Sequence, residues 1–177
     1  LIPVVGMLAA ACATAAEPLK SGPQVGDKVP GPFEPFNVTG PNADEEWCLY
    51  CKFGNDPVIM IFAREMSEPL DALLRKVDQL SAEHKKADLG TCAIFVDKGT
   101  GLRPALKTVA ARNKLNHVIL ATLDAPPKGY DINKDADVTV LLYSRSAVKA
   151  NHAFRKGELN EKAIAAIAAD ISKILPK

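Results

Sequence analysis

The sequence has no excess of either charge. Its 22 lysines and arginines balance 21 aspartates and glutamates, which gives a formal net charge of +1, and no basic tail or stripe stands out. Proteins whose main partner is a nucleic acid or an anionic membrane carry such a basic surface. The composition therefore argues against both classes of partner.

The chain also lacks an apolar run long enough to cross a membrane. Residues 1–16 carry no charge and end in small residues, but a spanning helix needs roughly 20 apolar residues. Such a segment is typical of a secretory signal peptide, here without its initiating Met and basic region. We therefore expect a periplasmic or extracellular protein, cleaved near Ala16, with no membrane span. A lipid anchor at Cys12 is disfavoured because Leu8 lies one position too far upstream and Ala9 takes its place.

Cysteine is scarce. After the expected cleavage three cysteines remain, Cys48, Cys51 and Cys92. An odd number in an exported protein indicates one disulfide plus one buried thiol, or a site that uses thiols. Cys92 lies within the apolar run "TCAIFV", which predicts a buried side chain that behaves as a small hydrophobe. The alternative is that it pairs with Cys48 or Cys51.

What the sequence does contain is an alternation of apolar strands and amphipathic helices. Residues 17–32 are rich in Pro and Gly and are predicted to be a linker into a single domain at 33–177, which opens with a β-hairpin arm at 33–57. The predicted strands are 58–63, 89–97, 117–123, 138–143 and 147–154, and the predicted helices are 67–84, 102–115 and 159–175. Strand–helix–strand units predict a parallel sheet covered on both faces, which the last two strands extend as an antiparallel hairpin.

Two stretches within this pattern resemble a known superfamily. "VGDKVPGPFEPFNVTG" and "GNDPVIMIFA" look like the entry segment and the first core strand of exported thioredoxin-like domains of the peroxiredoxin/thiol-oxidoreductase superfamily. The resemblance covers residues 26–175. It implies an α/β thioredoxin-like fold, with a central mixed β-sheet flanked by helices and an N-terminal β-hairpin arm.

The superfamily's usual active-site Cys pair is missing from its place at the start of the first core helix. Matching Phe62 and Pro69 to the family pattern puts Ser67-Glu68-Pro69-Leu70 where the dithiol stands. Free backbone N–H groups and the helix dipole stabilise a thiolate there, but they cannot ionise a serine. Ser67 is therefore predicted to be a helix cap, and peroxide reduction by the family mechanism is excluded. Val138 stands where the family has a cis-proline.

A Cys-x-x-Cys pair, Cys48 and Cys51, lies upstream of the first core strand. In a regular strand these side chains would stand too far apart for a disulfide, so the segment must turn or bulge at Leu49-Tyr50 for the pair to close. One interpretation is a structural disulfide that pins the hairpin arm in a redox-inactive binding module. Another is a displaced thiol–disulfide site for a protein or peptide thiol, with Cys48 as the more exposed, attacking thiol and Cys51 as the resolving one.

A third interpretation is a Cu(I) or Zn(II) site, because a Cys-x-x-Cys turn is a common half-site for these metals. The sequence offers no obvious second half, since its histidines are scattered: His84, His117 and His152. We predict no other cofactor. If the protein is a binding module, its partner would use the family's old cleft, for which the candidate residues are Arg64, Glu65, Ser67, Glu68, Val138 and Thr139.

Overall fold

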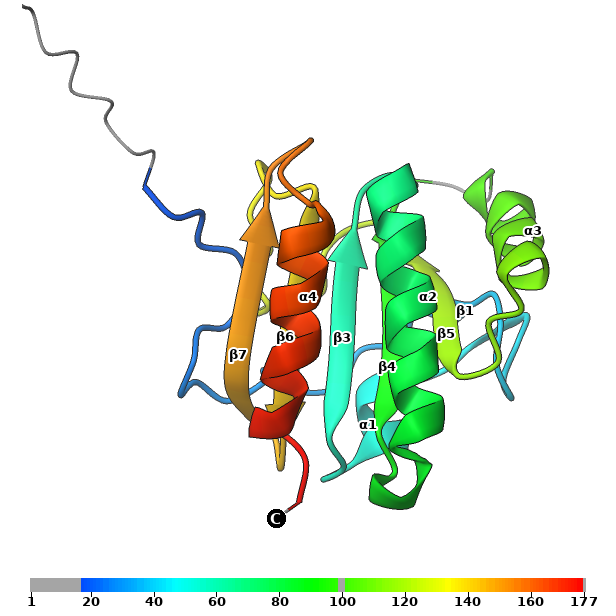
Figure 1. Ribbon diagram of the computed structural model, residues 1–177. Coiled ribbons are helices and arrows are strands. Elements are labelled where there is room, and N and C mark those ends of the chain that lie inside the picture. The colour runs from blue at the N-terminus through cyan, green and yellow to red at the C-terminus, as the bar shows by residue number, and fades with distance from the viewer. Residues whose placement is uncertain (1–16, 99–100, 177) are drawn as a thin grey trace, which may run out of the picture.

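The computed structural model describes residues 17–98 and 101–176 (Figure 1). These residues contain one seven-stranded sheet with the order β2-β1-β5-β4-β3-β6-β7. The strands are β1 (Phe36–Asn37), β2 (Glu45–Glu46), β3 (Val58–Ala63), β4 (Gly90–Val96), β5 (Val118–Leu123), β6 (Val138–Ser144) and β7 (Ala147–Phe154). Strands β3, β4 and β5 run parallel, and the other pairings are antiparallel. The predicted mixed sheet is confirmed.

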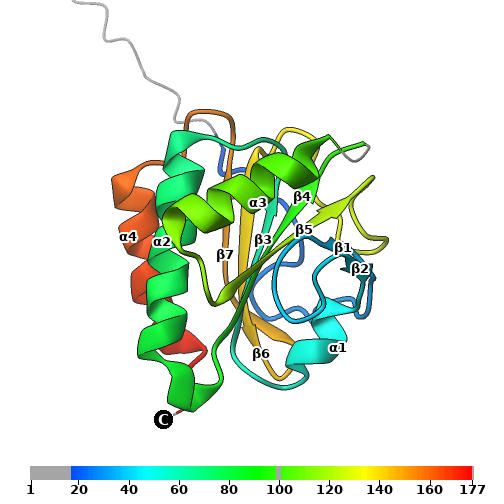
Figure 2. The same ribbon diagram turned by 90° about the vertical axis from the view of Figure 1, so that its right-hand side faces the viewer.

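Helices cover both faces of this sheet. The α-helices are α1 (Leu49–Phe53), α2 (Glu68–Glu83), α3 (Leu102–Asn113) and α4 (Glu161–Asp170), and two 3₁₀ turns follow as η1 (Lys85–Ala87) and η2 (Ile171–Lys173). Helices α2 and α4 lie on one face together with α3, whereas the short α1 lies on the other (Figures 1 and 2). No helix among residues 17–98 and 101–176 is long and apolar enough to cross a membrane.

The central strand β3 shows why the sheet is buried on both sides. All six of its residues are buried, as expected for a parallel strand that reads as one apolar run. Ile59 and Ile61 point into the core beneath α2 and α4, while Met60 and Phe62 point into the core beneath α1. Because successive side chains of a strand point to opposite faces of the sheet, alternate residues of β3 pack into the two cores.

Helix α2 confirms the helical periodicity read from the sequence. Leu70, Leu73, Leu74 and Val77 are at most 1% exposed and pack on the sheet. Their spacing of three and four residues places them on a single face of the helix.

The N-terminal region agrees with prediction in one part and differs in another. The arm at 33–57 contains the predicted hairpin, in which β1 pairs with β2 and also joins the sheet through β5. The segment 17–32 is irregular, but it is not a free linker. Ser21 and Val29 are 1% and 5% exposed, and the Ser21 hydroxyl lies 2.6 Å from that of Thr139. Packing on the domain therefore begins before residue 33, because this segment covers part of the sheet that the short α1 leaves open.

Candidate functional site

The Cys-x-x-Cys pair forms the first turn of a helix. Cys48 is the N-cap of α1, with φ −70° and ψ 104°, and its sulfur accepts a hydrogen bond of 3.1 Å from the backbone N–H of Cys51. A disulfide joins the two residues, with 2.04 Å between the sulfurs and 5.3 Å between the Cα atoms. The turn required at Leu49-Tyr50 is therefore confirmed, and a helical turn supplies it.

Helix α1 is too short to be stable by itself, and side chains on both of its flanks fix it. Leu49 and Phe53 are 0% and 8% exposed and pack into the second core. Tyr50, which lies inside the disulfide loop, shares a 2.8 Å hydrogen bond with the hydroxyl of Ser146 in the β6–β7 turn. The disulfide is thus attached to the rigid part of the domain.

The two cysteines differ in exposure. Cys51 is exposed, whereas Cys48 is only 9% exposed. The expectation that Cys48 is the more accessible of the two is therefore wrong, because the N-cap position turns its side chain back toward the helix. A hollow of about 360 Å³ lies beside the pair. It is lined by Glu34, Glu46, Trp47, Cys48, Cys51 and Lys52. Trp47, at 48% exposure, is one of the few large apolar side chains that face solvent.

The junction between β3 and α2, where the superfamily keeps its thiols, has a structural role here. Ser67 is the N-cap of α2, and its hydroxyl accepts a 3.3 Å hydrogen bond from the backbone N–H of Leu70. Pro69 occupies the first turn, where its missing N–H costs no hydrogen bond. The prediction that Ser67 caps the helix is confirmed.

The six residues predicted to line a cleft at this junction do not form one site. Arg64 donates to the backbone carbonyls of Ala136 and Asn133 at 2.9 and 3.1 Å, and Glu65 pairs with Lys156. Glu68 is exposed, and with Ser67 it borders a small hollow at the start of α2.

The other two predicted residues, Val138 and Thr139, are each 1% exposed. They face the interior because β6 is buried on both faces, so their proposed role in binding is corrected. The neighbouring Asp137 carboxyl has its pKa raised, first by burial and then by the charge of Glu65.

The third cysteine is not part of a site. Cys92 is fully buried and unpaired, as predicted, and burial raises the pKa of its thiol far above its usual range. Within the described part of the chain, no group of three or more His, Cys, Asp and Glu side chains could hold a metal ion. The Cys48–Cys51 pair alone would supply two sulfur ligands.

The disulfide and the vacated junction lie at opposite ends of the central strand. Helix α1 leads into the start of β3, whereas α2 leaves from its end (Figures 1 and 2). A six-residue strand is roughly 17 Å long, so the two places cannot contribute to one active site.

Solved structures show which fold this is, whereas no family model and no curated protein matches the chain. A proposed thiol:disulfide interchange protein DsbE from Chlorobium tepidum is 23% identical with a TM-score of 0.57, over 84% of this chain and 98% of that one. A secreted disulfide oxidoreductase from Mycobacterium tuberculosis, homologous to E. coli DsbE, is 11% identical with a TM-score of 0.57, over 79% and 94%. Peroxidoxin BcpB from Mycobacterium tuberculosis is 15% identical with a TM-score of 0.61, over 86% and 99%.

These similarities establish a thioredoxin-like fold and confirm the predicted fold class. The chain is not one that lacks a Cys pair altogether, since Cys48 and Cys51 stand within disulfide distance. The helix that carries them was not predicted from the sequence. One signal for it was available, because Gly54 follows α1 as its C-cap with φ 55°, and glycine at that position commonly ends a helix.

Proposed function

We propose that this protein is an exported thiol–disulfide oxidoreductase whose working pair is Cys48–Cys51, and that its substrate is a protein or peptide thiol. One observation carries the proposal: a Trp-Cys-x-x-Cys sequence occupies the first turn of a helix, with Cys51 exposed and the Cys48 sulfur accepting a backbone N–H. Thioredoxin-like enzymes activate a thiol by such a helix start. The local arrangement is therefore the one that the chemistry needs, at a different place in the fold.

The unequal exposure of the two cysteine residues assigns their roles. A substrate thiolate attacks the sulfur of Cys51, which is the exposed residue of the pair. The bond between Cys51 and Cys48 breaks, and its electron pair goes to Cys48. The N–H of Cys51 already points at the Cys48 sulfur, and a hydrogen bond to an anion is stronger than one to a neutral acceptor. Cys48 is thus the better leaving group.

A second substrate thiolate then attacks the sulfur of the first substrate in this mixed disulfide, and Cys51 leaves as a thiolate. Two substrate thiols become one disulfide, and the pair takes up two electrons and, on reprotonation, two protons. In the reverse direction Cys51 attacks and Cys48 resolves, which inverts the order expected from the sequence.

Two features of the surroundings support a protein or peptide substrate. Trp47 offers an exposed aromatic surface next to the disulfide, and Lys52 adds a positive charge beside Cys51, which favours its thiolate.

The fold is shared with a disulfide oxidoreductase described as secreted, which is consistent with export. Peroxide reduction by the family mechanism is not proposed, because Ser67 occupies the position of the thiol.

The alternative is a redox-inactive binding module in which Cys48–Cys51 is a structural disulfide. It is favoured by the firm attachment of α1, since Leu49 and Phe53 are buried against the sheet. The reduction potential of the Cys48–Cys51 pair distinguishes the two proposals. A structural disulfide has a potential below about −300 mV, whereas working pairs lie between about −270 and −120 mV.

The test equilibrates the protein with glutathione redox buffers and maps the thiols by mass. We expect the pair to titrate within the working range. We also expect Cys48→Ser to trap a mixed disulfide on Cys51, and Cys51→Ser to trap far less on the buried Cys48. A pair that stays oxidised throughout supports the structural role. Stoichiometric uptake of Cu(I) or Zn(II), lost in Cys48→Ala, would support a metal site instead.

A further inference from the structure

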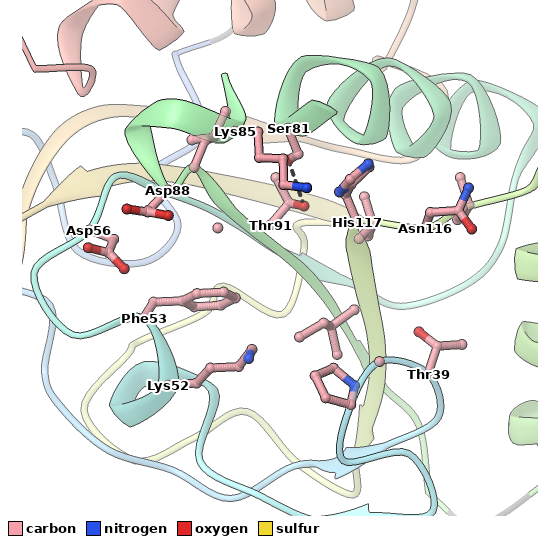
Figure 3. Close-up of a pocket in the computed structure, with 17 residues that line it drawn as sticks. Thr39, Lys52, Phe53, Asp56, Ser81, Lys85, Asp88, Thr91, Asn116 and His117 are labelled. Atoms are coloured by element: carbon pink, nitrogen blue, oxygen red, sulfur yellow. Dashed lines mark hydrogen bonds between the residues drawn. The ribbon is translucent and has the colours of Figure 1, made fainter. Parts of the chain in front are cut away.

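A second hollow, of about 380 Å³, lies next to α1 (Figure 3). Its walls come from α1, the turn at 39–41, the end of α2 with η1, and the first residues of β4 and β5. Among residues 17–98 and 101–176, Lys52 alone lines both this hollow and the one beside the disulfide. The two hollows therefore lie next to each other at Lys52.

The walls of this hollow are held in place by packing and hydrogen bonds. The ring of Phe53 lies so close to Gly90 that a Cβ at that position would overlap it. Ser81 and Thr91 share a buried 3.0 Å hydrogen bond across the back wall. Asp78 fixes the start of β5 by accepting from the backbone N–H of the hollow-lining His117 at 2.7 Å. The hollow is thus largely preformed, as ligand sites usually are.

Opposite charges line this hollow without neutralising each other. Lys52 and Lys85 reach into it from opposite walls, and Asp56 and Asp88 stand at one end (Figure 3). Among the described residues, none of these four side chains forms an ion pair. A ligand that carries both an anionic and a cationic group would complement both sets.

We infer that this hollow binds the free α-amino-acid group of a small peptide thiol, which is the substrate of the Cys48–Cys51 pair. The carboxylate of that group would lie at Lys52 and Lys85, and its ammonium at Asp56 and Asp88. A peptide whose α-amino-acid group is on the residue next to its cysteine would lie across Lys52, with that group in the second hollow and its thiol at Cys51. This inference rests on the proposed function, and the exchange follows the two steps given there.

The experiment compares how fast two thiols reduce the disulfide in the full protein. Glutathione carries an α-amino-acid group next to its cysteine, whereas 2-mercaptoethanol carries no charge. The quantity measured is the ratio of the two rates, because intrinsic thiol reactivity cancels when this ratio is compared between variants. The variants are Lys85→Ala and Asp88→Asn. Lys86→Ala, at an exposed position outside the hollow, is the matched control.

We expect the preference for glutathione to fall about two- to fivefold in Lys85→Ala and in Asp88→Asn, the range of a solvent-exposed ion pair, and to stay unchanged in Lys86→Ala. An equal preference in all of these proteins would overturn the inference while leaving thiol exchange intact. Binding of S-methylglutathione, whose sulfur cannot exchange, is measured by calorimetry alongside. Reduction by neither thiol, together with binding that weakens in Lys85→Ala, would refute the proposed function and still support the hollow as a site.

Discussion

Reduction of the Cys48–Cys51 disulfide should destabilise the fold by only about 2 kcal/mol. The two cysteines are three residues apart in sequence, so the bridge closes a loop of four residues. In the chain-entropy description, a loop of about four residues restricts the unfolded chain by about 1.9 kcal/mol at 25 °C. A folded domain has about 5–15 kcal/mol of stability, so the reduced protein should remain folded.

The anchors of α1 explain why the helix should survive reduction. Leu49 and Phe53 keep their places in the second core, and full burial of such side chains contributes about 1.5–3 kcal/mol each. The same free energy also shifts the reduction potential of the Cys48–Cys51 pair, because the fold stabilises the disulfide by as much as the disulfide stabilises the fold. About 1.9 kcal/mol corresponds to roughly 40 mV for a two-electron couple, a shift too small to lock the pair in its oxidised form.

The measurement is urea unfolding of the oxidised protein, the reduced protein and the Cys48→Ser/Cys51→Ser variant. The reduced and doubly substituted proteins should lose about 2 kcal/mol with unchanged cooperativity. Unfolding on reduction, or a loss above about 4 kcal/mol, would show that α1 depends on the bridge. The pair would then be a structural disulfide, and the reasoning for an exchange site would fail.

Three further changes test other parts of the structure. Gly90→Ala should destabilise the protein by about 1–3 kcal/mol in urea unfolding, because the new methyl group overlaps the ring that closes α1 on the sheet; no change would refute that packing. Ser67→Ala should lower the free energy of unfolding by about 1 kcal/mol, because the helix cap is lost, and it should leave the rate of thiol exchange unchanged. A slower exchange would indicate that the junction between β3 and α2 takes part in it. Burial alone would raise the pKa of the Asp170 carboxyl. Hydrogen bonds from Lys173 and His152 outweigh this effect, so the pKa lies below its ordinary value. Its contribution is therefore present above the pKa of the unfolded carboxyl and is lost as the pH falls through the lower folded value, and Asp170→Asn should flatten that acidic part of the stability–pH curve.

The core was predictable because its signal is periodic. The run 58–63 became β3, and the leucines of 70–80 became the buried face of α2. Ser67 was recognised as a cap because a hydroxyl just before an amphipathic run has one favoured use. These features depend on residues that are close together in the sequence, so they can be predicted from the sequence alone.

The candidate site was only half predictable, because it depends on contacts between distant residues. The pair Cys48–Cys51 could be read, but not the helix that brings it together, since α1 has five residues and is held by packing rather than by propensity. Its hydrogen bond to Ser146 spans almost a hundred positions. The error over Val138 and Thr139 has the same origin, because the family pattern places them near a site but does not show that β6 is buried on both faces here.

The displaced pair is physically reasonable because thiol chemistry needs local conditions rather than a particular place in a fold. It needs a backbone N–H directed at one sulfur, an accessible second sulfur and a rigid support. Cys48 receives the N–H of Cys51, Cys51 is exposed, and Leu49 supplies the support. The start of α2 meets only the last condition, since it carries no sulfur and the N–H of Leu70 already donates to the Ser67 hydroxyl. A partner that exchanges disulfides with this protein should therefore approach at α1, at the opposite end of the central strand from the junction that related folds use.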